Sequence, residues 1–396
     1  MSVQDFGIYS AAAAGLFAFL SVTVLVLTWL ERKALARIQM RMGPMRVGFH
    51  GVLQPIADAI KLVVKEDILP TSADGRVYWL APLAVFVPAI MLWVTIPVGE
   101  DLVLRNLELG LFYITAISVL SVMGLVMAGW GSANKYAFLG GLRAAGQLIS
   151  YEIPFIMAIL GVAMLSQSLD LTVIVGDQSA IANILVQPLG FFIFLLAGLA
   201  ELGRTPFDIH HAESEVVGGP FVEYSGAHWA VFFLAEYINT FTIAALTVLL
   251  FFGGWGWPDM PFDGAAHSAL SAVWFLAKTY AVILLMFWFR GTYPRLRIDQ
   301  LMAFGWQGLV PLSFINIVIT GVAKFYGWHW LALTGMSVGV LAIAFYVIKR
   351  QPGTSAERMT VSVIRAGDLR SAPPTGGEGQ QSAEPVPSAP RPDGGS

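Results

Sequence analysis

Residues 10–30 read Ser-Ala-Ala-Ala-Ala-Gly-Leu-Phe-Ala-Phe-Leu-Ser-Val-Thr-Val-Leu-Val-Leu-Thr-Trp-Leu, without one charged side chain. As a helix, this stretch rises roughly 30 Å, which is the thickness of the hydrocarbon core of a bilayer. Eight further stretches are similarly long and apolar: 77–97, 111–130, 148–166, 183–202, 229–252, 270–289, 308–326 and 329–348. The sequence therefore predicts an all-α, polytopic membrane protein.

The composition agrees with this fold class. Of 396 residues, 56% are hydrophobic and 12% are charged, about half the charged fraction of a typical soluble domain. The formal net charge of -3 leaves no basic excess for binding nucleic acid. The chain has 0 Cys, which excludes disulfides, thiolate zinc sites and iron–sulfur clusters held by its own thiolates. We expect neither a metal nor a redox cofactor bound by this chain.

Lys and Arg are distributed unequally between alternate connecting segments. One set holds Arg105 and Lys324, whereas the other holds Arg32, Lys33, Arg37, Arg41, Arg46, Lys61, Lys65, Arg76, Lys135, Arg143, Arg204, Arg290, Arg295 and Arg297. The positive-inside rule places the second set in the cytoplasm, and hence the N-terminus outside and the C-terminus inside a bacterial cell membrane. The membrane domain spans residues 1–350, and the Pro, Gly and Ser content of residues 351–396 predicts a disordered cytoplasmic tail.

Residues 52–66 show a second helical pattern that is too short to cross a bilayer. One face carries apolar side chains and another carries charges: Ile56, Ala57, Ile60 and Val64 against Asp58, Lys61 and Lys65. This predicts an amphipathic helix at the cytoplasmic interface. Two interpretations remain: its cations contact lipid headgroups, or the helix forms one wall of a chamber for a lipid-soluble ligand.

Four ionisable residues fall inside or at the ends of apolar stretches, where a charge is expensive: Glu152, Glu201, Glu236 and Lys278. Neutralising pairs would explain part of this set, with Glu201 bound to Arg204 and Lys278 bound to Glu236. Glu152 has no such partner nearby in the sequence. Because burial disfavours the charge of a lone carboxylate, Glu152 is a candidate proton carrier.

The segment from residue 203 to 228 is predicted to be an acidic cytoplasmic loop, since it contains Asp208, Glu213, Glu215 and Glu223. Metal binding by His210, His211, Glu213 and Glu215 is the less favoured interpretation, because adjacent His side chains on a helix point apart. We favour a hydrated relay of carboxylates that leads from this loop into the bundle.

Several motifs, in order from about residue 10 to 325, resemble the H subunit of proton-pumping NADH:quinone oxidoreductase, respiratory complex I. They are Glu31-Arg-Lys, Arg37-Ile-Gln-Met-Arg-Met-Gly-Pro-Met-Arg-Val-Gly, Leu53-Gln-Pro-Ile-Ala-Asp-Ala-Ile-Lys-Leu-Val-Val-Lys-Glu-Asp, Leu142-Arg-Ala-Ala-Gly-Gln-Leu-Ile-Ser-Tyr-Glu-Ile, Arg204-Thr-Pro-Phe-Asp, Ala212-Glu-Ser-Glu, Glu223-Tyr-Ser-Gly, Leu234-Ala-Glu-Tyr and Arg290-Gly-Thr-Tyr-Pro-Arg-Leu-Arg-Ile-Asp-Gln-Leu-Met. The resemblance implies a subunit at the junction between the electron-transfer arm and the proton-pumping arm.

The resemblance also implies roles for particular residues. The quinone chamber would include Arg37, Gln39, Arg41, Arg46, Asp58 and Lys61. The proton path would include Glu152, Glu201, Asp208, Glu213, Glu215, Glu223 and Glu236, to which we add Lys278 for its depth in the membrane. Docking of other subunits would involve Arg143, Arg204, Arg290, Arg295 and Arg297. Ubiquinone or menaquinone would be the substrate, with FMN and the iron–sulfur clusters in partner subunits of the hydrophilic arm and further small subunits in the membrane arm.

The chain departs from the family pattern in two ways. His211 stands where the family usually has a carboxylate, so the local charge depends on whether its imidazole is protonated. The family core also has eight spans, so the ninth span and the tail inherit no role. Three alternatives remain: the equivalent subunit of a related complex such as an energy-converting hydrogenase, a stand-alone transporter, and a purely structural anchor.

Overall fold

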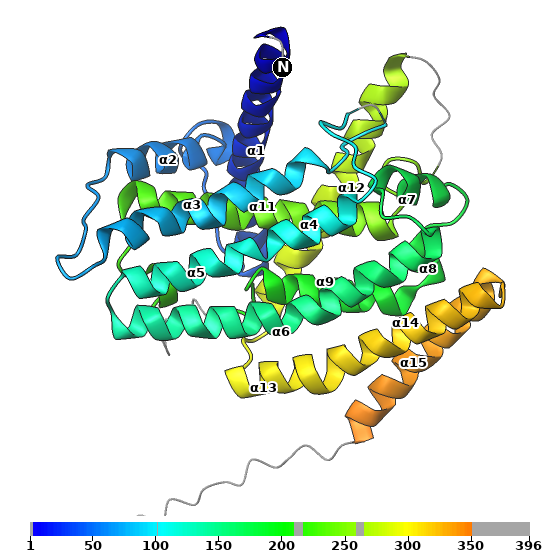
Figure 1. Ribbon diagram of the computed structural model, residues 1–396. Helices are drawn as coiled ribbons and strands as arrows, with labels where there is room; N and C mark the ends of the chain where they lie inside the picture. Colours follow the sequence, from blue (N-terminus) through cyan, green and yellow to red (C-terminus); the bar gives the residue numbers. More distant parts are fainter. Residues whose placement is uncertain (1–2, 101, 210–216, 259–264, 351–396) are drawn as a thin grey trace, which may run out of the picture. The chain divides into compact units, whose positions relative to one another are not determined.

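The computed structural model describes residues 3–100, 102–209, 217–258 and 265–350, and these ranges contain helices and connections without a strand (Figure 1). The helices are α1 (Val3–Ile38), η1 (Phe49–Gly51), α2 (Gln54–Val64), α3 (Gly75–Met91), η2 (Leu92–Val94), α4 (Gly110–Ser118), α5 (Leu120–Gly131), α6 (Lys135–Ser166), α7 (Leu171–Asp177), α8 (Asn183–Val186), α9 (Pro188–Glu201), η3 (Gly219–Phe221), α11 (Gly226–Phe251), α12 (Ala265–Thr292), α13 (Ile298–Ala303), η4 (Phe304–Leu309), α14 (Val310–Phe325) and α15 (Trp330–Arg350). The packing described below is that of residues up to Ala344, which form one compact unit.

Within the described ranges, 8 helical segments are long and apolar enough to cross a membrane, which confirms the all-α polytopic fold. The predicted ninth span appears as α15. The predicted stretch 183–202 is instead divided between the short helix α8 and α9, an apolar helix of 14 residues. The break falls at Gln187, because the proline at 188 disfavours helical geometry in the residue before it.

The predicted amphipathic helix is α2, which is shorter than residues 52–66 at both ends. Pro55 occupies its first turn, and Lys65 has extended backbone geometry that stops it. The helix packs against α1 and α11. Its apolar side chains Ile56 and Ile60 are nevertheless 42% and 60% exposed, as an interfacial helix requires.

Helix α11 lies at the centre of the unit and contacts α1, α3 and α12. Its Phe241 ring stacks on Trp93 with the ring centroids 4.6 Å apart, and the Trp93 indole donates a hydrogen bond to Thr242. Beside it, α3, α5, α6 and α14 follow one another in contact (Figure 1). Gly124 permits the close approach of α5 to α3, since a Cβ atom there would lie 2.9 Å from the Val85 nitrogen.

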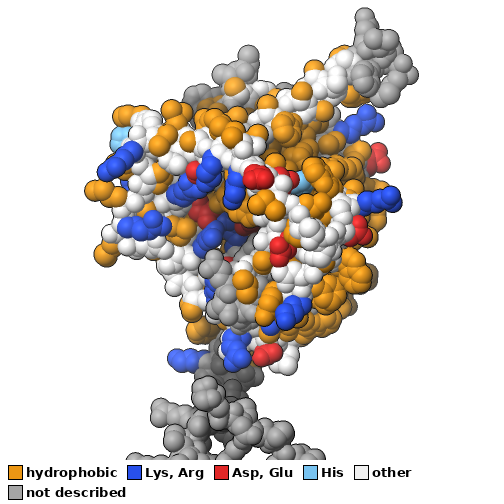
Figure 2. All heavy atoms as spheres, turned by 90° about the vertical axis from the view of Figure 1, so that its left-hand side faces the viewer, with side chains coloured by type: hydrophobic (Ala, Val, Ile, Leu, Met, Phe, Trp, Pro, Cys, Tyr) orange, Lys and Arg blue, Asp and Glu red, His pale blue; other side chains and the backbone are white. Residues whose placement is uncertain are grey.

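Figure 2 shows the face that carries the α2 helix and the ends of α3, α5 and α6. Many Lys and Arg side chains gather on this face, around a hollow in which acidic and basic side chains meet. We call this face the basic end of the bundle.

Candidate functional site

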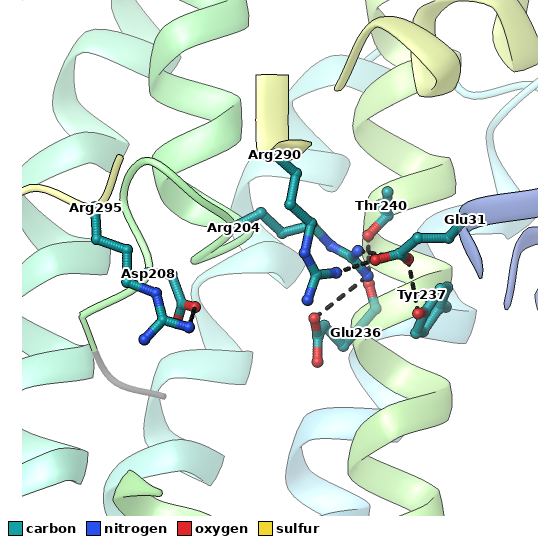
Figure 3. Close-up of polar contacts among 8 residues, drawn as sticks. All are labelled: Glu31, Arg204, Asp208, Glu236, Tyr237, Thr240, Arg290 and Arg295. Carbon is teal, nitrogen blue, oxygen red and sulfur yellow. Dashed lines mark hydrogen bonds and ion pairs between the residues drawn. The ribbon is translucent and has the colours of Figure 1, made fainter. Parts of the chain in front are cut away.

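Glu31 lies near the basic end of α1 and is 3% exposed. Its Oε2 atom accepts hydrogen bonds from Arg204 Nη1 at 2.8 Å and from Tyr237 Oη at 2.7 Å. Its Oε1 atom accepts a hydrogen bond from Arg290. This one carboxylate therefore joins α1 to α11, to α12 and to the segment that follows α9 (Figure 3).

Arg204 connects this carboxylate to a second one. Its Nη2 atom lies 3.3 Å from Glu236 Oε1, and its guanidinium carbon lies 4.6 Å from the centre of the Tyr237 ring. Burial disfavours the charged form of Arg204, but the neighbouring Glu31 and Glu236 carboxylates outweigh burial and raise its pKa above the usual value. Arg204 therefore stays positively charged, and we call this group the Glu31 cluster: Glu31, Arg204, Glu236, Tyr237 and Arg290.

The local chain explains why Arg204 turns towards α1. Gly203 has a φ of 60°, so the backbone reverses just after α9 ends. Gln147 of α6 then holds both sides of the turn, since its amide nitrogen donates to the Ala200 carbonyl at 2.7 Å and to the Phe207 carbonyl at 2.8 Å. The predicted pair between Glu201 and Arg204 is therefore wrong, because the reversal carries the guanidinium group away from α9.

A polar hollow of about 510 Å³ adjoins the Glu31 cluster. Its lining includes Asp208, whose Oδ2 atom lies 3.1 Å from Arg295 Nη2 (Figure 3). Arg204, Glu236 and Arg290 line the same hollow. Asp208 is 7% exposed, whereas the Arg295 side chain is 50% exposed, so this ion pair lies between the buried site and the surface.

A second, smaller cavity of about 90 Å³ lies between α3, α5, α6, α9 and α11. Glu152, Glu201 and Glu236 line it together with the polar side chains of Ser118, Ser121, Asn239 and Thr242. Most of its lining is apolar, but its volume admits about three water molecules, for which these polar side chains are hydrogen-bonding partners. Glu236 lines both this cavity and the polar hollow, so one carboxylate connects them.

The two remaining carboxylates of the small cavity have few partners. Glu152 Oε1 and Glu201 Oε2 are buried and accept no hydrogen bond from the residues that the structure describes. Buried polar atoms are normally hydrogen-bonded, and exceptions often mark functional groups. For Glu152 this agrees with the absence of a nearby cation in the sequence.

Lys278 does not pair with Glu236, so that expectation is wrong. Its ammonium group donates instead to two backbone carbonyls of the connection between α11 and α12, Phe252 at 3.1 Å and Trp257 at 2.7 Å. Neither acidic cavity is lined by Lys278. The two carbonyls accept from two of the three N–H donors of the ammonium group.

We expect Lys278→Met to lower the thermal stability of the assembled protein, because the two carbonyls lose their donor, an effect of about 1–3 kcal/mol. Proton transport per electron should stay unchanged. Lys324→Met is the control, since Lys324 also donates to one carbonyl, Leu165, but lies in an exposed position. Thermal denaturation and proton transport measurements on the same variants distinguish a stabilising role of Lys278 from a role in proton transfer. Loss of transport with unchanged stability would instead place Lys278 on the proton path.

The other predicted proton carriers are partly described. Glu223 Oε1 accepts a hydrogen bond of 2.6 Å from Asn134, the residue that caps the N-terminus of α6, and it lines neither acidic cavity. Glu213 and Glu215 lie outside the described residues, as do His210 and His211. Neither the favoured carboxylate relay through this loop nor the less favoured metal binding is therefore tested at these four residues.

The six residues predicted for the quinone chamber lie apart from the two acidic cavities. Arg41 donates to Gln39 at 2.6 Å on the exposed segment that follows α1. Asp58 of α2 binds Arg32 at 2.6 Å and lies 4.0 Å from Lys61. The remaining residues, Arg37 and Arg46, are exposed.

The arginines predicted to dock other subunits occupy different environments. Arg204 is 4% exposed and belongs to the Glu31 cluster with Arg290. Arg143 is half-buried in α6, whereas Arg297 is exposed, and the Arg297 backbone nitrogen donates to Gln300 at the start of α13.

Sequence reasoning missed Glu31 and Tyr237 as site residues. Glu31 is an acid at the start of a run of cations, Glu31-Arg-Lys, within the first apolar helix. That position was the one available signal, because the partners of Glu31 lie 173 and 259 residues away along the chain.

Comparison with known proteins agrees with the motifs. The family model described as NADH dehydrogenase matches residues 11–321. The NADH-quinone oxidoreductase H subunit from Dehalococcoides mccartyi (strain CBDB1) is 48% identical over 305 residues, which cover 77% of this chain and 84% of that protein. The H subunits of the NADH-quinone oxidoreductases from Geobacillus kaustophilus and Rhizobium etli are 47% and 45% identical, over 81% of this chain in both cases and over 93% and 95% of their own lengths. The predicted resemblance is confirmed, and the chain belongs to the NADH dehydrogenase family, together with the H subunits of NADH-quinone oxidoreductases.

Proposed function

We propose that this chain is the membrane-embedded H subunit of a proton-translocating NADH-quinone oxidoreductase in a bacterial cell membrane. Its role is to link quinone binding near the basic end to proton transfer along buried carboxyl groups. Electron transfer from NADH belongs to partner subunits that carry FMN and iron–sulfur clusters, because this chain has 0 Cys with which to hold such a cluster.

The observation that carries this proposal is the position of Glu236. Glu236 lines the polar hollow beside Asp208 and also the small cavity beside Glu152 and Glu201. A proton that enters through the hollow can therefore reach the small cavity by way of a single carboxyl group. Water in the small cavity would complete the steps that the side chains do not span.

The Glu31 cluster could couple negative charge in the polar hollow to proton transfer at Glu236. Arg204 is shared between Glu31 and Glu236, so a negative charge that arrives in the polar hollow competes with Glu236 for the same guanidinium group. A weaker contact with Arg204 leaves Glu236 without its cationic partner. Quinone reduction, which creates negative charge and takes up protons, would in this way act on the proposed proton path at Glu236.

The basic end faces the cytoplasm in this proposal. The cations on this face would meet the hydrophilic subunits and anionic headgroups there (Figure 2). One side of the quinone chamber, which partner subunits complete, would be formed by the exposed residues Gln39, Arg41, Arg46 and Lys61 and by the half-buried Asp58.

The test is Glu236→Gln in the complete complex. An amide cannot take up and release the proton, so we expect proton transport coupled to quinone reduction to fall by about tenfold or more. Glu66→Gln is the matched control, because Glu66 is exposed in the segment after α2. Transport is measured in proteoliposomes that contain the purified complex.

Unchanged transport in an assembled Glu236→Gln complex would refute the proposed path. Mass spectrometry of the complex purified through this chain identifies its partner subunits and bound quinone. Soluble partners without an NADH-oxidising flavoprotein would favour a related complex with another electron donor.

A further inference from the structure

A third hollow, of about 690 Å³, lies between α1 and α12 towards the basic end. Neither acidic cavity shares a lining residue with it. Its apolar wall includes Trp29, Phe49 and Leu284, and its polar side chains are Lys33, Arg37 and His50. The hollow is therefore separate from the carboxylates of the proposed proton path.

The polar side chains of the hollow are all basic. Lys33 Nζ lies 2.9 Å from the sulfur of Met45, which is a weak acceptor, and Arg37 makes no ion pair with any residue in the described part of the chain. The neighbouring cations differ, because Arg32 is paired with Asp58 and Arg290 with Glu31. The hollow therefore offers positive charge without a carboxylate of its own.

The helix faces on either side of the hollow combine an exposed apolar part with a cationic part, which matches the acyl chains and the charged headgroup of a lipid. On α1, Val22, Val26, Trp29, Lys33 and Arg37 follow one another at spacings of three or four residues and so share one face. Val22 and Val26 are 59% and 41% exposed, and Lys33 lies roughly 16 Å further along the helix than Val22. Trp29 lies between the apolar and the cationic part, where tryptophan is enriched in membrane proteins.

Helix α12 continues the apolar wall. Leu284 is 43% exposed and Trp288, one turn further towards the basic end, is 56% exposed. Acyl chains can therefore contact two exposed apolar faces, while a headgroup lies beside Lys33 and Arg37.

The wall formed by Phe49 and His50 is held by specific backbone geometry. The Trp29 indole donates to the His50 carbonyl at 3.2 Å. Gly51 has a φ of 77°, and a Cβ atom there would collide with the Pro44 carbonyl oxygen, so the turn requires glycine. This tight turn holds His50 beside α1.

We infer that the hollow between α1 and α12 binds one anionic phospholipid, with its phosphate headgroup at Lys33 and Arg37 and its acyl chains along the exposed faces of the two helices. The site is distinct from the proposed proton path and assigns Arg37 to lipid rather than to quinone. Charge complementarity selects an anionic lipid over a zwitterionic one.

The experiment uses the complete complex in phosphatidylcholine nanodiscs that contain a small fraction of phosphatidylglycerol with a photoactivatable acyl chain. After irradiation, labelled peptides are quantified by mass spectrometry per mole of assembled complex. We expect label on residues 22–37 and 277–288. Each single substitution, K33Q or R37Q, should reduce it about fivefold, and the double substitution about twentyfold.

The controls K65Q and R76Q remove exposed cations from the same end of the bundle and should leave the label unchanged. The pair K33R/R37K keeps both charges and should restore it. Unlabelled phosphatidylglycerol should displace the probe. Equal labelling of wild type and K33Q/R37Q, displacement by phosphatidylcholine or by inorganic phosphate alone, or absence of label from both helices would each overturn the inference.

Discussion

Glu31→Gln is expected to destabilise the assembled protein by about 3 kcal/mol, which lowers its Tm by about 5 °C or more. Wild-type Glu31 accepts from Arg290 through Oε1 and from Arg204 and Tyr237 through Oε2. Glutamine has one acceptor oxygen and one donor nitrogen, so either Arg290 or the other two donors then face an amide N–H. The substitution also leaves two guanidinium groups beside the single remaining carboxylate of Glu236.

A double substitution shows whether Glu31→Gln destabilises the protein through unbalanced charge or through altered side-chain packing. Glu31→Gln with Arg204→Gln removes one charge of each sign and leaves Arg290 and Glu236 to balance each other. Replacing both members of a buried ion pair is often close to neutral, whereas removing one member leaves an uncompensated charge. We therefore expect the double variant to regain part of the lost stability, as a double-mutant cycle measures.

Thermal denaturation of the purified complex and the yield of assembled complex are the measurements. Glu66→Gln serves again as the control, because it removes an exposed carboxylate outside the cluster. A Glu31→Gln complex that assembles in wild-type yield and melts at the wild-type temperature would contradict the stabilising role of the Glu31 cluster.

The spans could be predicted from the sequence because a bilayer imposes one simple requirement, a long apolar run. Residues 183–202 are the exception, because this largely apolar stretch is divided into α8 and α9 at Gln187 and Pro188. A hydrophobicity profile does not show this interruption. It is predicted by the backbone conformation of the residue before a proline, which is restricted away from the helical region.

The partners of the buried charges could not be predicted in the same way. A pairing rule based on sequence spacing assigned Arg204 to Glu201, three residues away, but Gly203 reverses the chain and turns Arg204 to Glu31 and Glu236. Lys278 illustrates a second limit, because its acceptors are backbone carbonyls, which every residue type carries. The isolation of Glu152 was predictable, since it required only that no cation lie nearby.

The second large effect concerns Glu152→Gln and Glu201→Gln. Both side chains line the small cavity, and each has a buried oxygen that accepts no hydrogen bond from the described residues. An amide of the same shape has no charge to desolvate and no titratable proton near neutral pH. We expect coupled proton transport to fall by about tenfold or more in each variant.

The same two variants should melt within about 1 kcal/mol of wild type, in contrast to Glu31→Gln. Glu152→Asp and Glu201→Asp keep the carboxyl group and should retain more transport than the amides, which distinguishes the titrating group from the shape of the side chain. Transport in proteoliposomes and thermal denaturation of the same preparations provide both readouts. Wild-type rate and stoichiometry in an assembled Glu152→Gln complex would remove Glu152 from the path.

The same Glu→Gln substitution is therefore expected to have opposite effects at the two sites: loss of stability at Glu31, and loss of proton transport at Glu152 and Glu201. Glu31 accepts hydrogen bonds from three donors, and two of them are guanidinium groups that its negative charge balances, so the Glu31→Gln substitution should reduce stability. Glu152 and Glu201 accept from no such donor in the described part of the chain, so the Glu→Gln substitutions at these two positions should leave stability nearly unchanged and reduce transport. If stability fell equally in all three variants, the small cavity would hold carboxylates that are paired for structure, and proton transfer would have to use another route.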